Sequence, residues 1–126
     1  MKKPLSLIAG IIFLSLFILI LTMIEPYKRQ KNLCRITEEY RKEPIRGYIL
    51  NKYLDEDNHM SETVIIQSAY KGKTKKKDLT LDHTGLYGYI SIGDSLYKPS
   101  GTLRTLVVRG NEKNYFILDF GCEKTE

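Results

Sequence analysis

Twenty consecutive residues near the N-terminus, from Leu5 to Ile24, carry no charged side chain, and this run constrains the chain more than any other feature. As a helix with a rise of about 1.5 Å per residue it is roughly 30 Å long, the thickness of the hydrocarbon core of a bilayer. A helix packed on a soluble core shows a polar stripe, and this run has none. The run therefore predicts a single membrane-spanning helix.

A cleaved signal peptide is the alternative interpretation, because Lys2 and Lys3 precede the run. The apolar part of a signal peptide is about 7–15 residues long and is followed by small residues at the cleavage site. This run is longer and no such site follows it, which favours an uncleaved anchor. A short basic N-terminus before a long apolar run is typical of a signal anchor, and it favours a domain outside the cytoplasm. Basic residues on the two flanks of the run nearly balance, so orientation stays open.

The stem that follows the anchor is rich in charge. Leu33, Ile36 and Tyr40 recur in it at spacings of three and four, which predicts a helix with one narrow apolar stripe, and Pro44 ends it. The predicted segments are a short basic N-terminus (1–4), a transmembrane helix (5–24), a charged juxtamembrane stem (25–44), a small β domain (45–122) and a tail (123–126).

From Ile45 onward, short β-type runs are separated by turn residues. The clearest pair is Leu103 to Arg109 and Tyr115 to Phe120, which a five-residue loop joins into a hairpin. The alternation of Leu79 and Leu81 predicts a further strand, and residues 89–92 another. The fold class is therefore mainly β: after the transmembrane helix and stem, a small antiparallel barrel or rolled sheet of about five to six strands.

The chain has two cysteines, Cys34 and Cys122, and both follow the predicted anchor. An even number of cysteines in an exported domain is compatible with one disulfide, and two unpaired thiols are the other interpretation. Neither cysteine belongs to a C-x-x-C motif, so the pattern indicates no redox or zinc site.

A lysine-rich segment lies between two predicted strands. It is interpreted as a mobile, solvated loop, and the weaker hypothesis is that its charges bind an anionic surface. The net charge of +5 is too small to indicate a nucleic-acid binder. The lysines of this segment are Lys71, Lys73, Lys75, Lys76 and Lys77.

Two short segments are similar to motifs of membrane-anchored β enzymes. Residues 102–106, followed by Arg109, resemble the active-site strand of sortases, but Leu106 stands where their cysteine nucleophile belongs. Gly93, Asp94 and Ser95 resemble a Gly-Asp turn of type I signal peptidases, without the serine and lysine motifs of those enzymes. The interpretation from the residues is a structural turn, with positive φ at Gly93 and with the Asp94 carboxylate accepting hydrogen bonds from nearby backbone amides.

The acidic loop at 55–59 lacks the glycine of a calcium-binding loop. His83 follows an aspartate, but no nucleophile is placed beside it in the sequence. No catalytic residue, metal site or cofactor is therefore expected.

The order of these features resembles a group of small uncharacterised bacterial membrane proteins. Their shared traits are an N-terminal transmembrane helix and a β domain with a Gly-Asp-Ser-Ile/Leu-x-Lys element, which here runs from Gly93 to Lys98. The resemblance implies a fold and a location at the cell membrane, and it brings no activity.

The leading functional hypothesis is a non-enzymatic interaction or structural module of the cell envelope, tethered by one membrane span. A protein partner in the envelope is compatible with this hypothesis, and nucleic acid is not expected. The alternative is a degenerate or minimal envelope hydrolase of sortase-like or signal-peptidase-like β fold. Polar side chains that converge in a concave pocket would favour the alternative.

Overall fold

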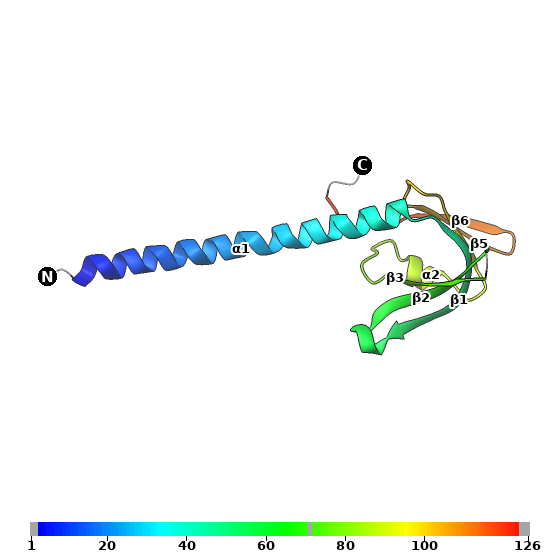
Figure 1. Ribbon diagram of the computed structural model, residues 1–126, viewed down its shortest axis with the longest axis horizontal. Helices are drawn as coiled ribbons and strands as arrows, with labels where there is room; N and C mark the ends of the chain where they lie inside the picture. Colours follow the sequence, from blue (N-terminus) through cyan, green and yellow to red (C-terminus); the bar gives the residue numbers. More distant parts are fainter. Residues whose placement is uncertain (1–2, 71, 124–126) are drawn as a thin grey trace. The chain divides into compact units, whose positions relative to one another are not determined.

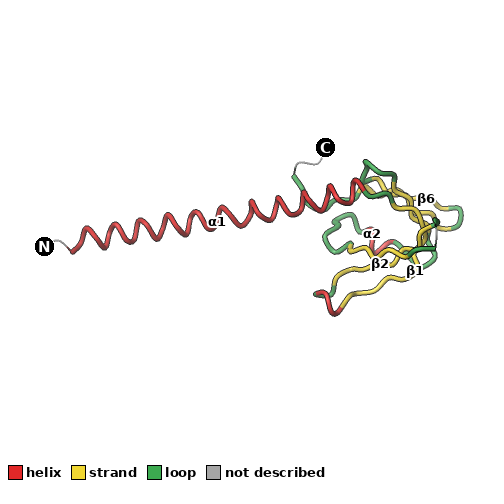
Figure 2. The backbone as a smooth tube through the Cα atoms, in the orientation of Figure 1, coloured by secondary structure: helices red, strands yellow, loops and turns green. Residues whose placement is uncertain are grey.

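The computed structural model describes residues 3–70 and 72–123, and Figure 1 labels its elements. Figure 2 distinguishes helix, strand and loop along the same backbone. The chain divides into two compact units, the first ending at Asn32 and the second beginning at Leu33. In chain order the elements are α1 (Lys3–Lys42), β1 (Ile45–Asp55), the 3-10 turn η1 (Glu56–Asn58), β2 (Ser61–Ser68), β3 (Thr74–Asp78), α2 (Leu86–Tyr89), β4 (Ser95–Lys98), β5 (Arg104–Arg109) and β6 (Glu112–Ile117).

The first unit is α1 as far as Asn32, and the large hydrophobic side chains of its apolar part are exposed. Two of its hydroxyls are satisfied within the helix. Ser15 donates to the carbonyl of Ile12 (2.9 Å), and Thr22 donates to that of Leu19 (2.8 Å). By length and composition α1 is the one helix among the described residues that is able to cross a membrane, and a signal sequence shares these properties.

The last turns of α1 belong to the second unit. The predicted stem (25–44) is helical as far as Lys42, where α1 ends. The side chains of Ile36 and Tyr40 pack against the core of the β domain. The folded domain therefore begins at Leu33, within the predicted stem, because the apolar stripe of the stem covers part of the core.

The second unit contains a six-stranded sheet in the order β3-β2-β1-β4-β5-β6, and every neighbouring pair is antiparallel. Strand β1 lies near the centre and pairs with β2 on one side and with β4 on the other. A register shift between Ile49 and Asn51 bends it, and Figure 1 shows a strongly curved sheet. The prediction of an antiparallel sheet is confirmed. The sheet is open, with β3 and β6 at its edges, so it is not a closed barrel.

One face of the sheet is covered by the last turns of α1, by α2 and by the segment after β6. The ring of Tyr40 on α1 lies 4.6 Å from the ring of Phe120, centroid to centroid. The buried apolar residues form one cluster. Its members are Ile45, Ile49, Val64, Ile66, Leu79, Leu86, Ile90, Leu96, Leu103, Val107, Leu118 and Phe120.

Gly47 lets β1 and β2 approach each other closely. A β-carbon at this position would lie 2.1 Å from the carbonyl oxygen of Gln67 on β2. No side chain fits at that distance, so the third residue of β1 has to be glycine for this pairing to form.

The segment between β3 and β4 differs from the prediction. The expected strand around Leu79 and Leu81 is a turn, and α2 occupies part of the expected strand at 89–92. The Asp78 carboxylate accepts a hydrogen bond from the backbone N–H of Thr80 (2.9 Å). An aspartate that satisfies the backbone two residues ahead favours a turn over a strand. Leu79 is buried and Leu81 is exposed. Leucines that alternate with polar residues resemble the sequence of a strand, but this segment is a turn.

The terminal hairpin exists, with a tighter turn than predicted. Strands β5 and β6 pair up to Arg109 and Glu112, so Gly110 and Asn111 form a two-residue turn in place of a five-residue loop. Gly110 has φ 57°, a backbone angle that glycine adopts readily. The strand β6 ends at Ile117, and the chain continues as an irregular segment in which Leu118 and Phe120 pack into the core.

Candidate functional site: a cationic pocket with an apolar floor

The turn from Gly93 to Ser95 is built into the sheet. Gly93 has φ 93°, and the carboxylate of Asp94, which is 4% exposed, accepts a hydrogen bond from the backbone N–H of Ser91 (2.8 Å). Arg109 on β5 donates to both oxygens of the same carboxylate, at 2.9 and 2.7 Å. Hydrogen bonds from Arg109 hold the pKa of Asp94 below its usual range, against the opposing effect of burial. An ion pair between Asp94 and Arg109 therefore holds the turn in place, and its role is structural. Nothing in the sequence alone indicates that Arg109 is the partner of Asp94.

The lowered pKa of Asp94 predicts that the stability of the domain depends on pH. The pKa of Asp94 is lower in the folded state than in the unfolded state. The contribution of its carboxylate to the stability of the fold is therefore complete above the unfolded-state pKa of about 3.9, and it is lost as the pH falls through the folded-state pKa. We expect Asp94→Asn to destabilise the domain by about 1–3 kcal/mol at neutral pH, the cost of impaired buried hydrogen bonds. The difference from the wild type should shrink in acid. The measurement is the unfolding free energy of the full chain from pH 7 to 3.

The matched control is Asp57→Asn, which removes the same charge from an exposed residue of η1. It should change stability by less than about 0.5 kcal/mol. Equal effects of the two substitutions would contradict a specific role for the Asp94 and Arg109 pair.

The lysine that closes the Gly-Asp-Ser-Leu-x-Lys element is buried. Lys98 is 0% exposed, because the alternation of β4 places it on the core face together with Leu96. Its ammonium donates to the backbone carbonyls of Thr102 (3.1 Å), Arg41 (3.4 Å) and Pro99 (3.4 Å). Burial lowers the pKa of Lys98 below its usual range. The lysine links the C-terminal end of α1 to the loop between β4 and β5.

The lysine-rich segment is not the mobile loop that the sequence predicts. Residues 74–78 form the edge strand β3, paired with β2, and the alternation of a strand separates the lysines by face. Lys75 and Lys77 both reach the carboxylate of Glu43, whereas Lys76 pairs with Asp55.

The remaining lysines of the segment are not part of this strand. Lys73 is exposed before β3. Lys71 lies outside the described residues.

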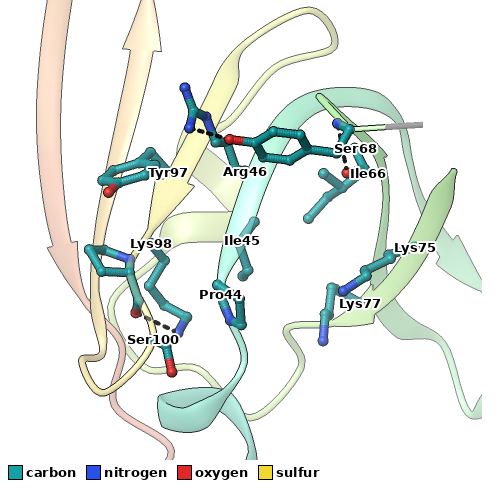
Figure 3. Close-up of a pocket in the computed structure, with 12 residues that line it drawn as sticks. Pro44, Ile45, Arg46, Ile66, Ser68, Lys75, Lys77, Tyr97, Lys98 and Ser100 are labelled. Carbon is teal, nitrogen blue, oxygen red and sulfur yellow. Dashed lines mark hydrogen bonds between the residues drawn. The ribbon is translucent and has the colours of Figure 1, made fainter. Parts of the chain in front are cut away.

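Lys75 and Lys77 line a pocket of about 430 Å³ at the end of the sheet where β1 begins and β2 and β4 end. Ile45 and Ile66 contribute apolar surface to it, and Tyr97 contributes an aromatic ring. In Figure 3 the side chain of Lys98 lies on one side of Ile45, and those of Lys75 and Lys77 lie on the other. The charged residues that line the pocket are Arg46, Lys75, Lys77 and Lys98.

Positive charge exceeds negative charge around the pocket. Four cationic side chains line it, and the two from β3 contact the carboxylate of Glu43. Burial acts to raise the pKa of Glu43, but hydrogen bonds from Lys77 and Lys75 outweigh burial and hold that pKa below its usual range. Arg46 donates to the hydroxyl of Tyr70 (2.6 Å) at the rim. Such an arrangement is suited to binding an anion that carries an apolar group.

The two cysteines are joined in a disulfide. Cys34 lies on α1 and Cys122 lies five residues after the end of β6, and their Cα atoms are 4.7 Å apart. The bond connects positions 88 residues apart in the chain, and it fixes the C-terminal segment to the last turns of α1.

The other residues considered in the sequence form no shared site. Leu106 is half-buried on β5, and residues 55–59 form η1 and its flanks. Among residues 3–70 and 72–123, no group of three or more His, Cys, Asp or Glu side chains is placed to hold a metal ion. Sequence reasoning missed Arg46 and Tyr97 as pocket residues, because only the pairing of β1 with β2 and β4 brings them together. It also missed Glu43 as the partner of Lys75 and Lys77.

Comparisons with protein-family models, with curated proteins and with solved structures find no match for this chain.

Proposed function

We propose that this chain is a single-pass membrane protein of the cell envelope whose disulfide-bonded β domain is a non-enzymatic binding module. The observation that carries the proposal is the cationic pocket, which combines charged and apolar surface in a concave site of small-ligand size. The apolar part of α1 supplies the anchor in this proposal, because a helix of that length and composition suits a bilayer.

The disulfide supports a location of the domain outside the cytoplasm. Disulfides persist in oxidising compartments and are rare in the cytoplasm, where thiols are kept reduced. A bond between Cys34 and Cys122 therefore favours the signal-anchor orientation, in which the short basic N-terminus stays inside.

The residues of the enzyme-like motifs have structural partners, which supports a non-enzymatic role. The Asp94 carboxylate is bound by Arg109 and by a backbone amide, and Leu106 has no nucleophilic atom. Arg109, which the sortase resemblance would assign to oxyanion stabilisation, is engaged by Asp94 and by the carbonyl of Tyr89 (2.8 Å).

One observation favours the hydrolase alternative. Lys98 has a lowered pKa and lines the same pocket as Ser100, and a lysine beside a serine is one way to activate a nucleophile. Both groups have other partners: Ser100 donates to the carbonyl of Lys42 (2.7 Å), and Lys98 donates to three carbonyls. We therefore favour binding over hydrolysis.

The location is tested with the full chain carrying a C-terminal tag in bacterial cells. We expect the protein to stay in the membrane fraction at alkaline pH and to keep its N-terminal segment. Protease added to intact spheroplasts should remove the tag. Cys34 and Cys122 should react with a maleimide only after reduction, and the Cys34→Ala variant should show one thiol that reacts without reduction.

Two results would contradict the proposed location. A mature chain that begins near Tyr27 would identify the apolar run as a cleaved signal peptide. A tag protected in spheroplasts, together with thiols that react without reduction, would place the domain in the cytoplasm.

A further inference from the structure

We propose that the cationic pocket binds a phosphate ester that carries an apolar group, with Lys75 and Lys77 contacting the phosphate and Ile45 and Ile66 contacting the apolar part. This inference deepens the proposed binding function and rests on it. The shared chemistry is that of a lipid headgroup or of a soluble phosphate ester.

The two β3 lysines already hold an oxyanion. Lys75 Nζ lies 3.1 Å from Glu43 Oε1, and Lys77 Nζ contacts Glu43 Oε2. Two ammonium groups that converge on the two oxygens of one carboxylate are also placed to converge on two oxygens of one phosphate. Glu43 thus acts as an internal occupant of the phosphate position, and its side chain is about one-third exposed, so an incoming anion is able to reach the lysines.

The other cations contribute in different ways. Lys98 gives its three N–H donors to three backbone carbonyls, so it adds positive charge to the pocket without a donor for a ligand. The Arg46 guanidinium has five N–H donors, and it binds the Tyr70 hydroxyl through Nη1. Arg46 is therefore held at the rim as a planar group suited to phosphate oxygens.

The apolar residues distinguish an ester from inorganic phosphate. Ile45 and Ile66 are almost completely buried beneath the pocket, and Tyr97, Pro44 and Pro99 extend the apolar lining. Apolar contact gains free energy in proportion to the area removed from water, and inorganic phosphate offers no apolar area. We therefore expect an alkyl phosphate to bind more tightly than free phosphate.

Strand β3 supplies a matched control, because its alternation divides the lysines between two faces. Lys75 and Lys77 face the pocket, whereas Lys76 pairs with Asp55 and Lys73 precedes the strand. Lys75→Gln/Lys77→Gln and Lys73→Gln/Lys76→Gln remove the same charge from the same segment. Only the first pair removes the proposed phosphate contacts.

The experiment measures dissociation constants of the full chain in an uncharged detergent by isothermal titration calorimetry. The probes are inorganic phosphate, hexyl phosphate, dihexanoyl phosphatidylglycerol and, as the cationic control, hexyltrimethylammonium. We expect saturable binding of hexyl phosphate or of the short-chain lipid, tighter than that of inorganic phosphate and absent for the cation. Tighter binding of hexyl phosphate than of the lipid identifies a soluble source, and tighter binding of the lipid identifies a headgroup.

The variants give the direction of each effect. Lys75→Gln/Lys77→Gln should weaken binding by about tenfold or more, since two charge-assisted hydrogen bonds are lost. Lys73→Gln/Lys76→Gln should change it by less than about twofold, the effect of distant charge screened by salt. Glu43→Gln should tighten binding, because the internal competitor loses its charge while both lysines remain.

Three results would overturn the inference: no saturable binding of either phosphate ester at millimolar concentration, equal losses in the two double variants, or weaker binding by Glu43→Gln. Near-ultraviolet circular dichroism of the tyrosines establishes that each variant is folded. Failure of ligand binding in a chain that is anchored, exported and disulfide-bonded would overturn the phosphate site alone and leave the proposed location intact.

Discussion

Cys34→Ala/Cys122→Ala is expected to lower the unfolding free energy of the full chain by about 2–5 kcal/mol, towards the upper end of this range. A cross-link restricts the unfolded chain more strongly as the closed loop grows, and this disulfide joins residues 88 positions apart. The loss is a large share of the roughly 5–15 kcal/mol that stabilises a typical domain. It is measured by denaturant unfolding in detergent, followed by near-ultraviolet circular dichroism of the tyrosines.

Reduction provides the control for this prediction. A reductant should destabilise the wild type by a similar amount and leave the double alanine variant unchanged. An unfolding midpoint of the wild type that does not move on reduction would contradict the expected contribution of the bond.

Phe120→Ala should destabilise the domain by about 3–5 kcal/mol, the usual cost of truncating a buried aromatic side chain. Phe120 is 1% exposed and its ring lies 4.6 Å from that of Tyr40, so the substitution leaves a cavity between α1 and the C-terminal segment. The same unfolding measurement applies, with the disulfide kept oxidised.

The control lies three residues earlier. Ile117 belongs to the same apolar run but is 69% exposed, so Ile117→Ala should change stability by less than about 0.5 kcal/mol. Comparable losses in the two variants would show that this run is not divided into a buried and an exposed face as the structure has it.

The elements that could be predicted are those whose signal is local. An uncharged run of twenty residues indicates a long apolar helix whatever follows it, and the β-type run from Leu103 to Arg109 predicted the strand β5. The same reasoning failed for Leu79 and Leu81, because Asp78 and Asp82 bind neighbouring backbone amides and form turns. Alternating side chains in a turn resemble those of a strand until the hydrogen bonds are known.

The candidate site was less predictable, because its contacts join distant parts of the chain. The lysines at 75–77 were visible as a charged segment, but which of them face the pocket depends on strand pairing. Glu43 precedes them by more than thirty positions, and the sequence gives no sign that it contacts them. The same holds for Asp94 and Arg109, which meet because β4 and β5 are neighbours.

The disulfide also determines what happens to a chain that is cut. Because the bond joins Cys34 on α1 to Cys122 near the end of the described residues, it encloses every strand of the sheet. A single proteolytic cut in any loop between these cysteines leaves two fragments that remain covalently connected. The fragment that carries the C-terminus is thus released from α1 only when the disulfide is reduced as well.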